Sequence, residues 1–295
     1  MTVGFVLATA LVGLGAGWYV TMLVMRAPED TPLLGAPVCP DCDARLAVHE
    51  LVPVVSRLRL GRRCGQCDQR ISTRYPVIEV GTAGLMVVLA VVFGPTIEVV
   101  PLLVSVPVLV AVSVIDIDTY RIPNRLVWPS LAVGVLTVAA CAVVMGELGR
   151  LGGALVGALL FSGMLFIPHL IMPAGMGFGD VKFALYLGLN LGWLHAALPL
   201  PALVLSTLLA AVIGLTLQLT GRITGPSEGP NDAASEGSSL PDVDADPAGD
   251  ADDEDAPRPK RRLGRTKIPF GPFLAAGTYL AYLIEDAAIE VWLGP

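Results

Sequence analysis

Long runs of apolar residues alternate with short polar segments along almost the whole chain. One helix needs about 20 apolar residues to span a bilayer, and seven runs approach or exceed that length. One run is about twice as long as a span requires, and Pro199 and Pro201 divide it into two helices. The runs cover residues 3–25, 77–93, 99–115, 126–145, 151–172, 181–220 and 270–292. The pattern predicts an all-α, polytopic membrane protein with about eight transmembrane helices.

The composition supports this class and excludes others. Of the 295 residues, 54% are hydrophobic and 15% are charged, which is too apolar for a soluble globular domain. A secreted disulfide scaffold and a nucleic-acid-binding protein are excluded on the same grounds. The first run could instead be a cleaved signal peptide, but it lacks a basic n-region and a clear cleavage site. We therefore expect it to be retained as a helix in the lipid bilayer.

The net charge of −7 belongs to one segment of the chain. Eleven of the 26 acidic residues lie between Arg222 and Arg258, in a stretch rich in Gly, Pro, Ser and Asp. Such a stretch cannot bury enough apolar surface to offset the loss of chain entropy. We expect residues 222–267 to form a disordered linker; a phosphate-mimicking acidic tail is the alternative.

Basic residues predict the orientation in the membrane, because Lys and Arg accumulate in short cytoplasmic loops. Residues 26–75 contain eight arginines and should be cytoplasmic. Counting spans from there also places residues 116–125, 173–180 and 222–267 inside, and both termini outside. Arg150 is the exception, since its loop falls on the outer side.

Four cysteines in the first polar loop form two CxxC pairs, with 21 residues between the pairs. This spacing suits four thiolates around one tetrahedral zinc ion. Two disulfides are the alternative, which a reducing cytoplasm disfavours. The predicted metal ligands are Cys39, Cys42, Cys64 and Cys67. Cys141 lies in the middle of an apolar run and is expected to be a buried small hydrophobic residue.

Two polar loops place acidic residues at the predicted cytoplasmic ends of spans. Asp116 ends the third span, and Asp180 begins the sixth. Either acid could simply cap a helix or pair with Arg121 or Lys182. Together they suggest more, because two neighbouring carboxylates cannot both ionise comfortably. One then holds a proton while the other activates a water molecule against a peptide carbonyl, as in aspartyl proteases. Asp118 is a rival to Asp116, and spacing does not choose between them.

The residues around Asp180 read Gly177-Phe178-Gly179-Asp180-Val181-Lys182. Glycines there would let the backbone approach a substrate strand closely and adopt positive φ. Gly177, Gly179 and Lys182 are therefore candidates for contact with the substrate.

These motifs, in this order, resemble those of the prepilin peptidases, the type IV leader peptidase family of bacterial membrane aspartyl proteases. The resemblance covers the cysteine loop, the run Ile71–Glu79, the Asp116 loop, the GxGD motif and the late run Ile268–Pro272. It implies a catalytic dyad of Asp116, which stands seven residues before Pro123, and Asp180. Asp118 falls at a position that varies within the family.

The resemblance also implies a substrate, a cofactor and a location. Family members in the bacterial inner membrane cleave the short leader of type IV pilin-like precursors on the cytoplasmic side, and serve type IV pili or type II secretion. Many also methylate the new N-terminus with S-adenosylmethionine, an activity associated with the cysteine loop. The chain would then divide into a first helix (1–25), the cysteine loop (26–75), a peptidase core (76–221), the acidic linker (222–267) and a last helix (268–295).

Two hypotheses from other classes remain open on the sequence. In a transporter or channel with a regulatory zinc loop, Asp116 and Asp180 would bind a cation or relay protons. Both acids lie at the predicted membrane boundary, however, whereas carrier sites lie near the midplane. In an assembly protein, the cysteine loop would only recruit a partner.

Overall fold

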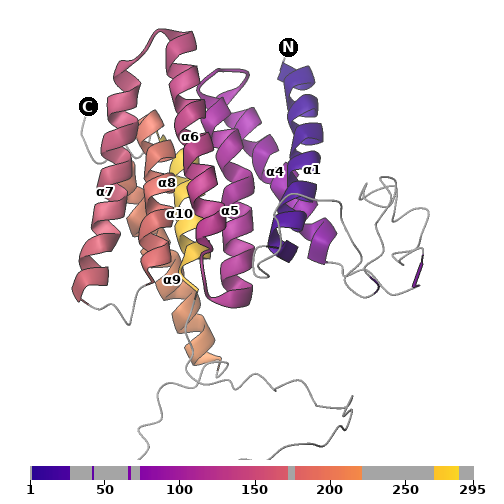
Figure 1. The fold of residues 1–295 in the computed structure, drawn as a ribbon, viewed down its shortest axis with the longest axis vertical. Coiled ribbons are helices and arrows are strands. Elements are labelled where there is room, and N and C mark those ends of the chain that lie inside the picture. The colour runs from indigo at the N-terminus through magenta and orange to yellow at the C-terminus, as the bar shows by residue number, and fades with distance from the viewer. Residues whose placement is uncertain are drawn as a thin grey trace, which may run out of the picture. The chain divides into compact units, whose positions relative to one another are not determined.

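The computed structural model describes residues 2–26, 42, 66–67, 74–171, 177–220 and 269–285. Within these ranges the regular secondary structure is entirely helical, which confirms the predicted all-α class. The helices are α1 (Thr2–Arg26), α4 (Arg74–Phe93), α5 (Val99–Thr119), α6 (Asn124–Met145), α7 (Gly149–Ile171), α8 (Phe178–Leu194), α9 (Pro199–Leu219) and α10 (Gly271–Leu283) (Figure 1).

Every apolar run of the sequence contains a helix, and the longest run is broken as predicted. α8 ends at Leu194 and α9 begins at Pro199, a position where proline's fixed φ suits the first helical turn. Six of the described helices are long and apolar enough to cross a membrane, which confirms a polytopic membrane protein. α8 and α10 are shorter, with 17 and 13 residues, so a count of eight spans stays a prediction. Residues 286–292, where the last run ends, lie outside the described part.

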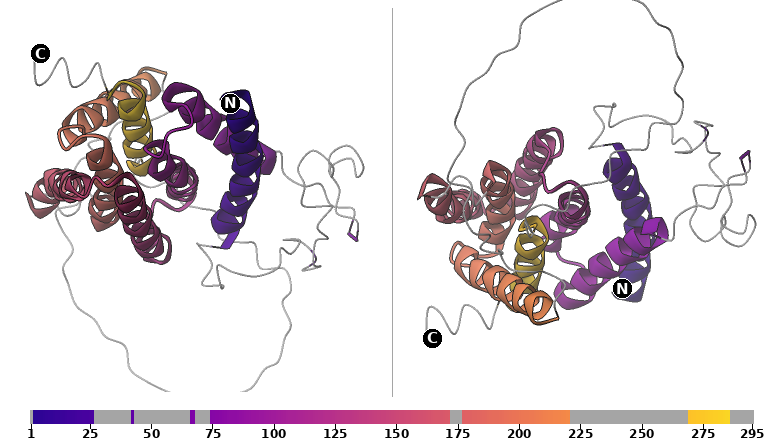
Figure 2. Two further views of the ribbon diagram at one scale, coloured as in Figure 1. Left: turned by 90° about the horizontal axis from the view of Figure 1, so that it is seen from above. Right: turned by 90° about the horizontal axis from the view of Figure 1, so that it is seen from below.

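The chain divides into two units, residues 1–212 with 269–295 and residues 213–268. The first unit contains the described helices except the C-terminal end of α9. Within it, α1 packs along α4, α7 packs along α8, and α10 packs against α5 and α8. Figure 2 shows α10 between α5 and α9. Helix α10 therefore joins the group of helices that begins 172 residues earlier in the chain, at α5.

Glycines allow α7 and α8 to approach almost backbone to backbone. A Cβ atom on Gly157 would lie 2.6 Å from the Gly188 carbonyl oxygen and from the Gly192 Cα. Gly153 makes a similar contact, at 2.8 Å from the Gly192 oxygen. Small residues are the usual means of close packing between membrane helices, where no hydrophobic driving force acts between them. This contact positions α8, whose first turn carries Asp180.

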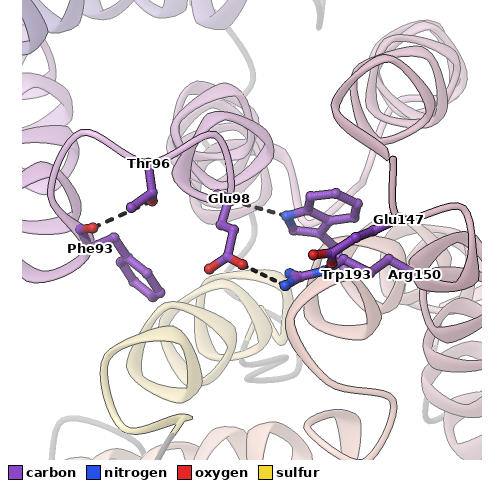
Figure 3. A network of polar contacts seen from close by, with 6 residues as sticks. All are labelled: Phe93, Thr96, Glu98, Glu147, Arg150 and Trp193. Atoms are coloured by element: carbon purple, nitrogen blue, oxygen red, sulfur yellow. Dashed lines mark hydrogen bonds and ion pairs between the residues drawn. The ribbon is translucent and has the colours of Figure 1, made fainter. Parts of the chain in front are cut away.

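A polar network ties α5, α7 and α8 together at the ends where α7 begins and α8 terminates (Figure 3). An Arg150 guanidinium nitrogen lies 2.5 Å from a Glu98 carboxylate oxygen, and Arg150 also pairs with Glu147. The guanidinium carbon lies 5.3 Å from the Trp193 ring centroid, and the Trp193 indole N–H donates to the Glu98 carbonyl at 3.0 Å. Arg150, the exception to the charge rule, is thus balanced by two carboxylates.

Candidate active site

Asp116 lies in the last turn of α5 and is buried, with 5% of its surface exposed. The helix stops just beyond it at Tyr120, which adopts the left-handed conformation (φ 54°) and donates its N–H to the Asp116 carbonyl at 2.8 Å. A left-handed residue is a common helix terminator. Pro123 disfavours helical geometry at the residue before it. The chain therefore turns into α6 directly after Asp116.

Asp180 lies in the first turn of α8 and is 9% exposed. Gly177, in extended conformation, precedes the helix, and its carbonyl accepts the Asp180 N–H at 3.1 Å. A carboxylate in a first turn also complements the positive end of the helix dipole. Figure 1 shows the C-terminal end of α5 and the N-terminal end of α8 at the same, lower end of the helices.

Gly179 is the residue that lets these two ends meet. A Cβ atom at this position would lie 3.0 Å from the Ile122 Cβ, which belongs to the turn after Asp116. The turn therefore packs directly on the first residues of α8. This contact brings the turn after Asp116 next to the first turn of α8, which carries Asp180.

Asp118 occupies a different environment, although it is only two residues from Asp116. Its carboxylate pairs with the Arg74 guanidinium at the start of α4, at 2.7 Å, and about a third of the side chain is exposed (35%). The structure thus brings Asp116 and Asp180 together and places Asp118 against α4. This arrangement favours Asp116 as the partner of Asp180.

The N-terminus of α10 contributes a third group. The backbone N–H of Gly271 donates to Oδ2 of Asp116 at 2.9 Å, in a buried position. No role was predicted for Gly271 from the sequence. Its signal was the Gly271-Pro272 pair at the start of an apolar run, since proline is favoured in a first helical turn.

Two expectations about the GxGD segment can be compared with its geometry. Positive φ was expected for its glycines, and this is wrong at Gly177, whose φ is −69°, and at Gly179, which is helical. Gly179 is needed for close packing against Ile122, and not for an unusual backbone conformation. Lys182 donates to Asn124 Oδ1 at 2.9 Å, and its ammonium group lies 4.6 Å from the Phe178 ring centroid. These contacts hold the half-buried Lys182 against the first residues of α6 and α8.

The predicted metal site lies mostly outside the described residues. Cys42 and Cys67 are described and exposed, whereas Cys39 and Cys64 are not described. Within the described ranges, no group of three or more potential metal ligands occurs. Four thiolates remain a donor set that suits zinc. Cys141 is buried in α6, as expected.

Two buried acids at adjoining helix ends can divide the work of acid–base catalysis. The ionised one can take a proton from a water molecule, while the protonated one donates to the oxygen of a polarised carbonyl. The Gly271 N–H holds one oxygen of Asp116 during such a cycle. This arrangement is suited to the hydrolysis of an amide bond.

Comparisons with known proteins agree with this chemistry. A model of the type IV leader peptidase family matches residues 103–218, and one of the bacterial peptidase A24 N-terminal domain matches residues 11–93. A prepilin leader peptidase/N-methyltransferase of Pseudomonas putida is 35% identical over 71% of this chain and 80% of its own length. Proteins of the same name from Pseudomonas aeruginosa and Bacillus subtilis are each 29% identical. They cover 98% and 86% of this chain, and 93% and 84% of their own lengths. No solved structure matches the chain.

Proposed function

The chain belongs to the type IV leader peptidase family, and from this premise we propose that it is a membrane aspartyl endopeptidase that removes the leader peptide of type IV prepilin-like precursors. The names of the relatives support both the substrate and the reaction. The same family membership argues against the transporter or channel hypothesis.

The catalytic pair of this proposal is Asp116 and Asp180. The single observation that supports it is that two buried acids lie at the ends of separate helices that pack together through Gly179 and Ile122. One carboxylate removes a proton from the attacking water, and the other donates a proton to the carbonyl oxygen of the scissile bond. When the resulting tetrahedral intermediate collapses, a proton passes to the leaving amine. Gly177 and Lys182, at the open edge of the dyad, are proposed to contact the precursor.

The proposal includes an orientation in the inner membrane. The ends of α5 and α8 that carry the dyad share one side of the helices with the start of α4, which follows the arginine-rich residues 26–74. The positive-inside rule supports a cytoplasmic position for that side. The same reasoning supports the division into a cysteine loop (26–75), a core, an acidic linker (222–267) and a last helix.

A second activity, N-methylation of the cleaved product, is proposed from the names of the relatives. S-adenosylmethionine would supply the methyl group when bound. We propose that Cys39, Cys42, Cys64 and Cys67 bind one zinc ion. A four-thiolate site has no open coordination position, so this ion would hold the loop together without activating water.

The experiment that tests the peptidase proposal uses the whole protein, purified in detergent. It is incubated with a type IV pilin precursor, with and without S-adenosylmethionine, and the product is weighed by mass spectrometry. Loss of the leader mass is expected, and a methyl increment would report the second activity. Asp116→Asn and Asp180→Asn should abolish leader loss, since an amide cannot cycle a proton.

Asp118→Asn is the matched control, because it makes the same chemical change two residues away from Asp116. It should retain cleavage within a few-fold of the wild type. Loss of activity in Asp118→Asn with retention in Asp116→Asn would contradict the choice of dyad. An intact precursor after incubation with the wild-type protein would contradict the peptidase function itself.

A further inference from the structure

We infer that Gly271 is a positioning residue of the peptidase reaction, which holds the Asp116 carboxylate in place through its backbone N–H and through the absence of a side chain. This inference rests on the proposed function and assigns a role to the start of α10. The hydrogen bond to Asp116 Oδ2 is 2.9 Å long and buried, and it joins residues 155 positions apart. It therefore fixes the rotation of a carboxylate that otherwise projects from the end of α5.

The space at Gly271 is occupied by the carboxylate itself. A Cβ atom built on Gly271 would lie 2.8 Å from Oδ2 and 3.3 Å from Cγ of Asp116. Carbon and oxygen atoms in ordinary contact are farther apart than 2.8 Å. Any side chain at position 271 would therefore displace the group that is proposed to act in catalysis.

Helix α10 is held by other contacts, so it cannot easily retreat from an added methyl group. The Tyr279 hydroxyl donates to the Leu85 carbonyl of α4 at 2.8 Å. Tyr282 and Ser105 of α5 share a buried hydrogen bond of 3.4 Å. Because these contacts lie two to three turns beyond Gly271, the strain at position 271 would fall mainly on the short Asp116 side chain.

The test compares Gly271→Ala with two other glycine-to-alanine variants, each as the full chain in detergent. Gly271→Ala should lower kcat about 100-fold, the scale expected when a catalytic group moves by roughly 1 Å, with little change in KM. Gly163→Ala should have no effect, because nothing lies within 4 Å of its Cβ position. Gly277→Ala should lower the thermal stability instead, because its Cβ would overlap Ser206 of α9.

A double-mutant cycle in thermal unfolding separates positioning from a general structural role. If Gly271 acts on the carboxylate, Gly271→Ala should reduce Tm when Asp116 is present and have little effect in an Asp116→Ala background. A Gly271→Ala protein that folds only in that background would support the inference equally well.

Wild-type kcat in Gly271→Ala would overturn the inference, as would an equal loss of stability, or a failure to fold, in both backgrounds. Failure of the wild type to cleave a pilin precursor would instead overturn the proposed function. The unfolding cycle would still decide whether Gly271 and Asp116 are coupled.

Discussion

The contact between Gly179 and Ile122 permits a quantitative prediction about the dyad. In a Gly179→Ala variant the new methyl carbon would lie 3.0 Å from the Ile122 Cβ. Carbon atoms in favourable contact are about 3.5–4.0 Å apart, so the turn after Asp116 and the start of α8 must separate by roughly 0.5–1 Å. Because Asp116 and Asp180 are on opposite sides of this contact, their separation grows. A misplacement of roughly 1 Å can cost on the order of 100-fold in rate, and we expect kcat for leader removal to fall about 10- to 100-fold.

The assay is the initial rate of leader removal from a purified pilin precursor, with kcat and KM determined separately. Gly177→Ala is the matched comparison within the same motif, because its Cβ would make only an ordinary contact of 3.4 Å with Asp180 Oδ2, and its φ of −69° suits alanine. Its kcat should fall by no more than a few-fold. Equal losses of kcat in both variants would refute the packing argument. A rise in KM in Gly177→Ala alone would agree with it, because Gly177 is proposed to contact the precursor.

The remaining predictions concern segments that lie wholly or mostly outside the described residues. Replacing Cys39 and Cys42 with Ser should release one equivalent of zinc, measured by elemental analysis, and diminish N-methylation, while leader cleavage persists at a reduced rate. A metal-free wild type purified under reducing conditions would refute the zinc site. Deleting residues 226–256 should leave cleavage within a few-fold, because a segment with the composition expected of a disordered linker can be shortened at low entropic cost. A loss as complete as that of Asp180→Asn would show that this linker has a function of its own.

The helical fold could be predicted from the sequence because each apolar run is long enough to form a helix by itself. Proline at position 199 also marked the break between α8 and α9 correctly. The number of spans was harder to predict, since α8 and α10 are short helices inside long apolar runs.

The residues of the candidate site could be predicted one by one, but the sequence did not show which of them lie together. Asp116 and Asp118 are two residues apart on a helix and therefore face nearly opposite sides. The sequence does not say which side faces α8, whereas the positions of Arg74 and Gly271 distinguish the two acids in the structure. Positive φ was predicted for the GxGD glycines because glycine permits it, whereas the structure uses Gly179 for close approach. The Gly271-Pro272 pair marks the start of a helix, but the contact with Asp116 joins residues 155 positions apart, and a local pattern does not identify the partner.

The contact between Gly271 and Asp116 can form only late in synthesis, because α10 is translated long after α5. Its hydrogen-bond acceptor, Asp116, is translated 155 residues earlier, which corresponds to roughly 8–30 s at ordinary rates of elongation. During that interval Asp116 and Asp180 can already be in the bilayer, but the group that orients one of them has not yet been made. A chain that stops before α10 would insert most of its helices and still lack an ordered dyad. With the dyad proposed above, cleavage therefore requires that translation has passed α10.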